Sequence, residues 1–158
     1  MAVKYWLLKT EPYVFSIDDF ANEKNKTTMW EGVRNYQARN MLRDDLKKGD
    51  LAFIYHSNAK PAGVAGIAKV VKEGYPDFTA FEKQHKYYDA KSKQDEPRWF
   101  MVDVKFVKKF KRLVSLEEIK GTKSLSEMVL VKNSRLSVQP VTKKEFDAIS
   151  KMADKPAK

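Results

Sequence analysis

The sequence has no cysteine among its 158 residues and only two histidines, His56 and His85. The lack of cysteine excludes disulfide bonds, thiolate metal ligands and a cysteine nucleophile, and it is compatible with a reducing compartment. Two histidines are too few for a histidine-rich metal site. We therefore expect a protein without a metal centre and without any other cofactor.

Long apolar runs are also missing. The N-terminal segment MAVKYWLLKTEP is interrupted by Lys4 and Lys9, and it is too short for the apolar core of a signal peptide. No stretch approaches the roughly 18–20 apolar residues that a membrane-spanning helix needs. We expect a protein that does not bind membranes and that resides in the cytoplasm if its source is bacterial, or in the nucleus if it is eukaryotic.

The motifs of common enzymes are absent as well. The sequence contains no G-x-G-x-x-G, G-x-x-x-x-G-K-[S/T], H-E-x-x-H or G-x-S-x-G pattern. The acids Glu11, Glu31, Asp50 and Asp103 are scattered, whereas metal-dependent nucleases gather carboxylates around two ions. These absences favour a binding protein over an enzyme. A nuclease or base-processing hydrolase that uses His56 as general base remains an alternative.

Positive charge and aromatic residues are abundant. The formal net charge is +10 and the isoelectric point is about 9.6, a balance that attracts polyanions. Charge alone is equally compatible with a soluble, lysine-rich protein of another kind. The 3 Trp, 7 Tyr and 9 Phe shift the balance, because nucleic-acid bases stack on such rings. We predict a nucleic-acid-binding protein.

The length favours a single domain, which we place at residues 1–150, followed by a disordered tail at 151–158. Apolar and alternating runs predict strands at 3–9, 50–56, 63–71 and 98–110, with extended segments at 27–30 and 128–138. Helices are predicted at 16–22, at 35–46 and after Thr142, and weak helical pieces between 74 and 97. This order predicts an α+β domain built on a curled sheet or small barrel that binds a ligand at its mouth.

Local signals support several of these elements. Capping boxes, in which a Ser or Thr precedes an acid by three residues, mark four helix starts. Gly63 and Gly66 lie inside one predicted strand, which indicates a bulge or a close approach of backbones. The four capping pairs are Ser16 with Asp19, Ser115 with Glu118, Ser124 with Glu127, and Thr142 with Glu145.

Four clusters of polar and aromatic residues stand where regular elements end, and site residues concentrate on such loops. In the second cluster, Trp30 offers a ring face for a base, Gly32 permits a close approach, and the amide of Asn35 suits a Watson–Crick edge. The alternative is that Trp30 packs in the core and Asn35 only caps a helix. The clusters are WLLKTEP at 6–12, WEGVRN at 30–35, YHS at 55–57 and RLSVQP at 135–140.

Together these segments resemble the EVE family, which shares its fold with PUA domains and is related to the YTH readers of methylated RNA. The segments WLLKTEP, WEGVRNYQARN, FIYHSN, GVAGIAKVVKEGYPD, PRWFMVDVKF and RLSVQPVTKKEF occur in the family's order. The resemblance implies a PUA-like pseudo-β-barrel of five or six strands flanked by short helices. It also implies a pocket for a modified base, such as a modified cytosine, flipped out of a duplex.

The resemblance carries over a set of pocket residues, and the sequence adds basic residues for the phosphates. Arg39 and Arg43 lie one helical turn apart, which suits backbone contacts, although a charge run is commonly just a solvated face. We expect a monomer that binds DNA or RNA carrying a modified base, with an RNA-binding PUA-like module as a further alternative. The base-pocket residues are Trp6, Lys9, Thr10, Trp30, Gly32, Val33, Asn35, Tyr55, His56, Ser57, Arg135, Ser137 and Pro140, and the phosphate-binding residues are Arg34, Arg39, Arg43, Lys108, Lys109, Lys111 and Arg112.

Overall fold

Six strands form one mixed sheet in the computed structural model, which describes residues 2–133 and 135–156. The strand order is β2-β5-β4-β3-β1-β6, so β2 and β6 are the two edges. Neighbours pair in antiparallel fashion except β1 and β3, which are parallel. The strands are β1 (Tyr5–Thr10), β2 (Thr27–Met29), β3 (Leu51–His56), β4 (Gly63–Pro76), β5 (Phe100–Ser115) and β6 (Val138–Val141).

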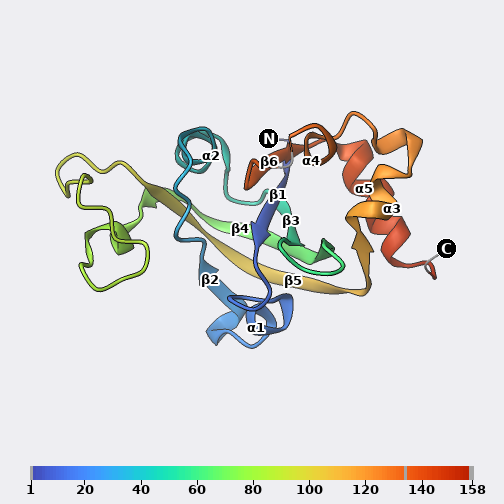
Figure 1. Ribbon diagram of the computed structural model, residues 1–158, viewed down its shortest axis with the longest axis horizontal. Coiled ribbons are helices and arrows are strands. Elements are labelled where there is room, and N and C mark those ends of the chain that lie inside the picture. The colour runs from blue at the N-terminus through green and yellow to red at the C-terminus, as the bar shows by residue number, and fades with distance from the viewer. Residues whose placement is uncertain (1, 134, 157–158) are drawn as a thin grey trace.

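Short helices flank this sheet, as Figure 1 shows, with α3, α4 and α5 gathered at one end and a long loop after β4 at the other. The α-helices are α1 (Ile17–Ala21), α2 (Tyr36–Asn40), α3 (Leu116–Lys120), α4 (Val129–Lys132) and α5 (Lys143–Ala153). Single turns of other helix types are η1 (Lys24–Lys26), η2 (Met41–Asp45), η3 (Phe78–Phe81) and η4 (Lys123–Leu125). The predicted α+β class with five or six strands and short flanking helices is confirmed.

Both faces of the central strands are buried, which explains why these strands read as nearly continuous apolar runs. Successive side chains of a strand point to opposite faces. Leu8 and Ile54 therefore join one core cluster, together with Trp30, whereas Leu7 and Phe53 join the other, beneath α3 and α5. The predicted strands at 50–56, 63–71 and 98–110 are present, although β4 and β5 each extend about five residues further, to Pro76 and Ser115.

The glycine and capping signals are largely confirmed. Complete capping boxes begin α1 and α5, and the Ser115 side chain caps α3. The register between β4 and β5 shifts between Val64 and Gly66. A Cβ on Gly63 or Gly66 would lie 2.4 Å from a carbonyl oxygen of β5, so the close backbone approach requires glycine at both positions.

Three expectations from the sequence are wrong. Residues 128–138 are not one extended segment, because burying Leu130 in the core winds Val129–Lys132 into a helical turn ahead of β6. Ser124 starts no capped helix, since it lies inside the turn η4. The tail does not fray at 151: α5 continues to Ala153, which is 1% exposed. Residues 157 and 158 of the predicted tail lie outside the described residues.

Asp50 joins the start of the chain to the sheet. Its buried carboxylate accepts hydrogen bonds from the backbone N–H of Lys4 (3.1 Å), the indole N–H of Trp6 (2.9 Å) and the backbone N–H of Lys47 (3.0 Å). Together these bonds connect β1, the turn before β3, and β3 itself. A buried donor left without its acceptor costs about 1–3 kcal/mol.

We expect Asp50→Ala to lower the free energy of unfolding by about 3 kcal/mol or more, because it leaves these donors unpaired. Urea denaturation followed by tryptophan fluorescence measures the change. Asp45→Ala removes an exposed carboxylate from the preceding turn and should stay within about 0.5 kcal/mol of the parent. Equal losses in the two variants would contradict the role assigned to Asp50.

Candidate nucleic-acid interface

A cleft of about 580 Å³ opens where β1 and β3 end. These strands run parallel, with Thr10 paired to His56, so the chain leaves both strands at the same edge of the sheet. The backbone N–H of Ser57 donates to the Thr10 carbonyl (2.9 Å), and that of Lys9 donates to the Ser137 carbonyl (3.0 Å). These two bonds bring three distant segments of the chain together around the cleft.

Most of the predicted pocket residues line this cleft. Trp30 borders it from within the core, where the ring is 6% exposed and packs against Phe15 and Phe20. Val33 is also buried beside it. Those of the predicted base-pocket residues that line the cleft are Lys9, Thr10, Trp30, Gly32, Val33, Ser57, Arg135 and Ser137.

Gly32 has a conformation and a neighbour that only glycine accommodates. Its φ is +84°, and a Cβ at this position would lie 2.4 Å from the ring of Tyr87. Its backbone N–H donates to a carboxylate oxygen of Asp77 at 2.8 Å. The loop after Trp30 is thereby held against the segment that follows β4.

Asp77 and Arg34 form the ion pair that closes this side of the cleft. The Asp77 side chain is 0% exposed, and its Oδ2 lies 3.0 Å from Nη1 of Arg34. Burial by itself would raise the pKa of Asp77, but hydrogen bonds from Thr79, Gly32 and Arg34 hold it below its usual value. Asp77 is therefore a carboxylate that the fold keeps ionised.

Arg34, which the sequence analysis places among the phosphate-binding residues, has its donors engaged within the protein. Its Nη2 donates to the Tyr87 carbonyl at 2.6 Å. Its guanidinium also lies over the rings of Tyr87 and Trp99, at 5.6 and 5.4 Å from their centroids. These contacts use the donors that a phosphate would need, so Arg34 shapes the cleft wall instead.

Burial displaces the pKa values of two ionisable side chains that line the cleft, Lys9 and Glu31. Burial lowers the pKa of Lys9 and raises that of Glu31. The Glu31 carboxylate lies 3.8 Å from Nε2 of His85, and among residues 2–133 and 135–156 it accepts no hydrogen bond at normal distance. The cleft thus holds a half-buried acceptor that polar groups of a ligand can reach.

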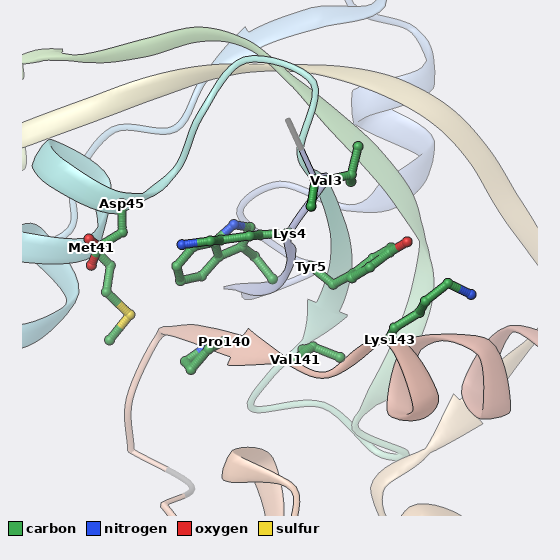
Figure 2. Close-up of a pocket in the computed structure, with 10 residues that line it drawn as sticks. Val3, Lys4, Tyr5, Met41, Asp45, Pro140, Val141 and Lys143 are labelled. Carbon is green, nitrogen blue, oxygen red and sulfur yellow. The ribbon is translucent and has the colours of Figure 1, made fainter.

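Trp6 and Pro140 do not belong to this cleft. They line a second, larger one of about 830 Å³ beside the first residues of β1, β6 and the turn η2 (Figure 2). Trp6 lies near the start of β1 and the cleft lies at its end. The indole N–H of Trp6 is moreover used by Asp50. These two predicted pocket residues therefore border a different cleft from the one that most of the predicted set lines.

Three further predicted pocket residues make contacts outside the cleft: Asn35, Tyr55 and His56. The Asn35 side chain caps α2 by accepting from the Ala38 N–H at 2.9 Å, as the alternative reading held. Alternation along β3 sends Tyr55 into the core cluster under α5. Nε2 of His56 accepts from the Ile17 N–H at 3.1 Å, and burial lowers its pKa. Among the residues that the structure describes, none of the three lines the cleft.

The other basic residues predicted to bind phosphate are spread over the surface. Arg39 donates to the Arg98 carbonyl at 2.6 Å, and Arg43 pairs with Asp44. Arg112 does not face solvent as a phosphate ligand would: it pairs with Glu118 and donates to the Met152 carbonyl, which anchors the end of α5. Lys108, Lys109 and Lys111 are exposed on β5, where Lys109 contacts Asp18 of α1 at 2.8 Å.

Sequence reasoning missed part of the cleft lining. Phe15 and Tyr87 add aromatic rings, Glu31 and Asn58 add polar groups, and Lys86 adds a cation. Glu31 and Asn58 directly follow Trp30 and Ser57, which were predicted to line the pocket. This adjacency is a sequence signal that could have indicated them. Lys86 and Tyr87 lie in the irregular segment after β4, where nothing in the local pattern indicates that the chain returns to Trp30.

The described residues contain no group of three or more His, Cys, Asp or Glu side chains that could hold a metal ion. Over the same residues, no helix combines the length and the apolar composition needed to cross a lipid bilayer.

We expect Asp77→Asn to destabilise the protein by about 2–3 kcal/mol, because it leaves the partly buried guanidinium of Arg34 without its counter-charge. Thermal unfolding at pH 7 measures the loss. An exposed control, Asp44→Asn, should stay within about 0.5 kcal/mol.

The same residue predicts an acid dependence. A carboxyl whose pKa is lowered in the folded state contributes stability above its unfolded pKa of about 3.9, and this contribution is lost as the pH falls through the lower, folded value. The parent should lose stability below about pH 4, and Asp77→Asn should lose less over the same range. Parallel acid profiles for the two proteins would contradict the assignment.

Sequence comparison matches residues 4–152 to the EVE domain. Thymocyte nuclear protein 1 of Homo sapiens is 46% identical over 168 residues, covering 96% of this chain and 74% of that protein. The predicted kinship with this family of proteins is thus confirmed at the level of sequence.

Solved structures agree closely with this fold. The crystal structure of the human THYN1 protein in complex with 5-methylcytosine-containing DNA matches this chain with a TM-score of 0.93 and 46% identity. The match covers 98% of this chain and 99% of that one. A hypothetical protein from Leishmania major has a TM-score of 0.92 and 47% identity, over 97% of this chain and 96% of that one.

Proposed function

We infer the function of this chain from the premise that it belongs to the EVE domain family, and we propose that it binds DNA and holds one modified cytosine in the cleft at the ends of β1 and β3. The observation that carries the proposal is the human relative, solved with 5-methylcytosine-containing DNA and sharing 46% identity over nearly the whole chain. The cleft's mixture of rings, small hydroxyls and cations supports it.

The base enters the cleft by leaving the stack, which costs a few kcal/mol. Stacking on an aromatic ring returns about 1–3 kcal/mol per base. Trp30 offers only a small exposed part of its ring, so we assign the larger stacking surface to Tyr87, which is half-buried and braced by Arg34. Trp30 then forms the floor behind the base.

Polar groups of the cleft read the edge of the base. Of the polar residues predicted for the pocket, Ser57 lines the cleft and is our candidate for this role, whereas Asn35 and His56 are engaged in the fold. Glu31 joins Ser57, because a carboxylate accepts hydrogen bonds from the exocyclic amine of cytosine. The methyl group of the modified base contacts Val33, whose buried side chain borders the same cleft.

The field of the +10 net charge brings the polyanion to this surface. Lys86 and Arg135 line the cleft, and we assign them to the phosphates beside the extruded base. Exposed lysines of β5 and the arginines of α2 and η2 add attraction that does not depend on sequence. We propose that the protein acts as a monomer, with a single DNA-binding domain that includes α5 to Ala153.

We propose a reader rather than a catalyst. The ring nitrogen of His56 that a general base would use accepts a backbone hydrogen bond from Ile17, which opposes the hydrolase alternative. The role places the protein where DNA is, in the nucleus of a eukaryote or the cytoplasm of a bacterium. Incubation of oligonucleotides with Mg²⁺ or Mn²⁺ tests for turnover, and products lost in His56→Ala would favour the hydrolase.

We expect a duplex with one 5-methylcytosine to bind several-fold tighter than the same duplex with cytosine at about 0.15 M salt. One methyl group in an apolar pocket contributes about 1–3 kcal/mol, which corresponds to roughly 5–150-fold. Fluorescence anisotropy with matched DNA and RNA oligonucleotides measures the preference. Equal affinity for all of them, falling steeply with salt, would leave only a polyanion-binding surface. A preference for RNA regardless of marks would favour an RNA-binding module.

Val33→Thr places a hydroxyl where the methyl group is expected, with little change in volume. We expect the preference for 5-methylcytosine over cytosine to fall toward one, while affinity for the unmodified duplex changes little. Val107→Thr is the matched control, because Val107 is 47% exposed on β5. An unchanged preference in Val33→Thr would place the methyl group elsewhere in the cleft.

A further inference from the structure

Tyr13 is the most exposed of the large apolar side chains on the described surface, at 72%. It lies between β1 and α1, at the rim of the cleft, because its chain neighbours Glu11 and Val14 both line that cleft. A single exposed ring is common on protein surfaces, so exposure alone carries no inference. What distinguishes Tyr13 is its place at the rim of the cleft and the contacts that hold it there.

The segment that carries Tyr13 is held in one conformation. The backbone N–H groups of Val14 and Phe15 each donate to the Glu11 carbonyl at 2.9 Å. The hydroxyl of Thr10 donates to the Phe15 carbonyl at 2.8 Å. These bonds form a tight turn whose far side packs on the core through Phe15, which contacts Phe20 and Trp30.

The ring of Tyr13 is held as well. Its hydroxyl donates to Oε2 of Glu11, and the same oxygen accepts from Nδ2 of Asn58 at 2.6 Å. These hydrogen bonds lower the pKa of Glu11. A side chain that is already ordered loses less entropy when it enters an interface.

An exposed, ordered ring beside a cleft for a flipped base has a specific use in duplex recognition. Extrusion of a base leaves a gap in the stack, and proteins that deform DNA fill such gaps with inserted side chains. Resting on the function proposed above, we propose that Tyr13 inserts into the duplex and fills the space vacated by the extruded base. Its partner is double-stranded DNA, since a single strand has no such gap.

Electrostatics around the turn agree with this partner. Lys9, Lys86 and Arg135 line the same cleft, so the turn lies within reach of cations that attract phosphates. Glu11 is an acid of the same turn, and its carboxylate is engaged by hydrogen bonds from Tyr13 and Asn58. The ring thus enters the stack from a surface that attracts the strands on both sides of it.

The test compares a duplex with a single strand, each carrying one 5-methylcytosine, at about 0.15 M salt. We expect Tyr13→Ala to weaken duplex binding about 10-fold, in line with the loss of one stacking contact, and to change single-strand binding less than about twofold. Tyr13→Phe keeps the ring and should retain most of the duplex affinity. Tyr36→Ala is the matched control, since Tyr36 is 53% exposed and lies outside the lining of the cleft.

A 2-aminopurine placed next to the 5-methylcytosine reports unstacking in the duplex. Its fluorescence should rise more with saturating Tyr13→Ala than with the parent, because the inserted ring of the parent stacks on the probe and the alanine leaves the gap open. Duplex binding unchanged in Tyr13→Ala, or equal losses for duplex and single strand, would overturn the insertion. A parent that shows no preference for 5-methylcytosine in either strand form would instead overturn the function proposed above, so the two failures are distinguishable.

Discussion

The buried ion pair between Asp77 and Arg34 is the interaction on which the cleft depends. Asp77 accepts from Thr79 in its own turn and from Gly32 and Arg34 in the loop after Trp30. Those two loops have no strand pairing to join them. A fully buried carboxylate is stable only when its hydrogen bonds are satisfied. The bonds that keep Asp77 ionised also hold the loop after Trp30 against the segment that follows β4.

The parallel pairing of β1 and β3 sets where the cleft can form. Parallel strands end at the same edge of a sheet, and here that edge releases Glu11 and Ser57 side by side. Trp30 lies in the loop that covers this edge. It packs in the core and also lines the cleft, so the same residue contributes to stability and to the site. A cleft built this way is largely preformed, which reduces the ordering that a ligand must impose.

Local patterns predicted much of the fold and part of the site. The apolar runs of β3 to β5 and the complete capping boxes at Ser16 and Thr142 act within a few residues, so the sequence shows them directly. The extended segment predicted at 128–138 is wrong because the burial of Leu130 contributes more to the local conformation than β propensity does. Trp6 and Trp30 were both predicted to line the base pocket, yet they border different clefts.

The sequence by itself determined the class of protein: basic, rich in aromatic rings, free of cysteine, and built from strands and short capped helices. Composition and short-range periodicity carry that information, because each depends on residue type and near neighbours alone. Only the tertiary structure decided which side chains face the cleft. It engaged His56 with Ile17 and Arg34 with Asp77, and it brought Tyr87 to Gly32. Those choices depend on contacts between residues about 40 to 55 positions apart, which no local pattern contains.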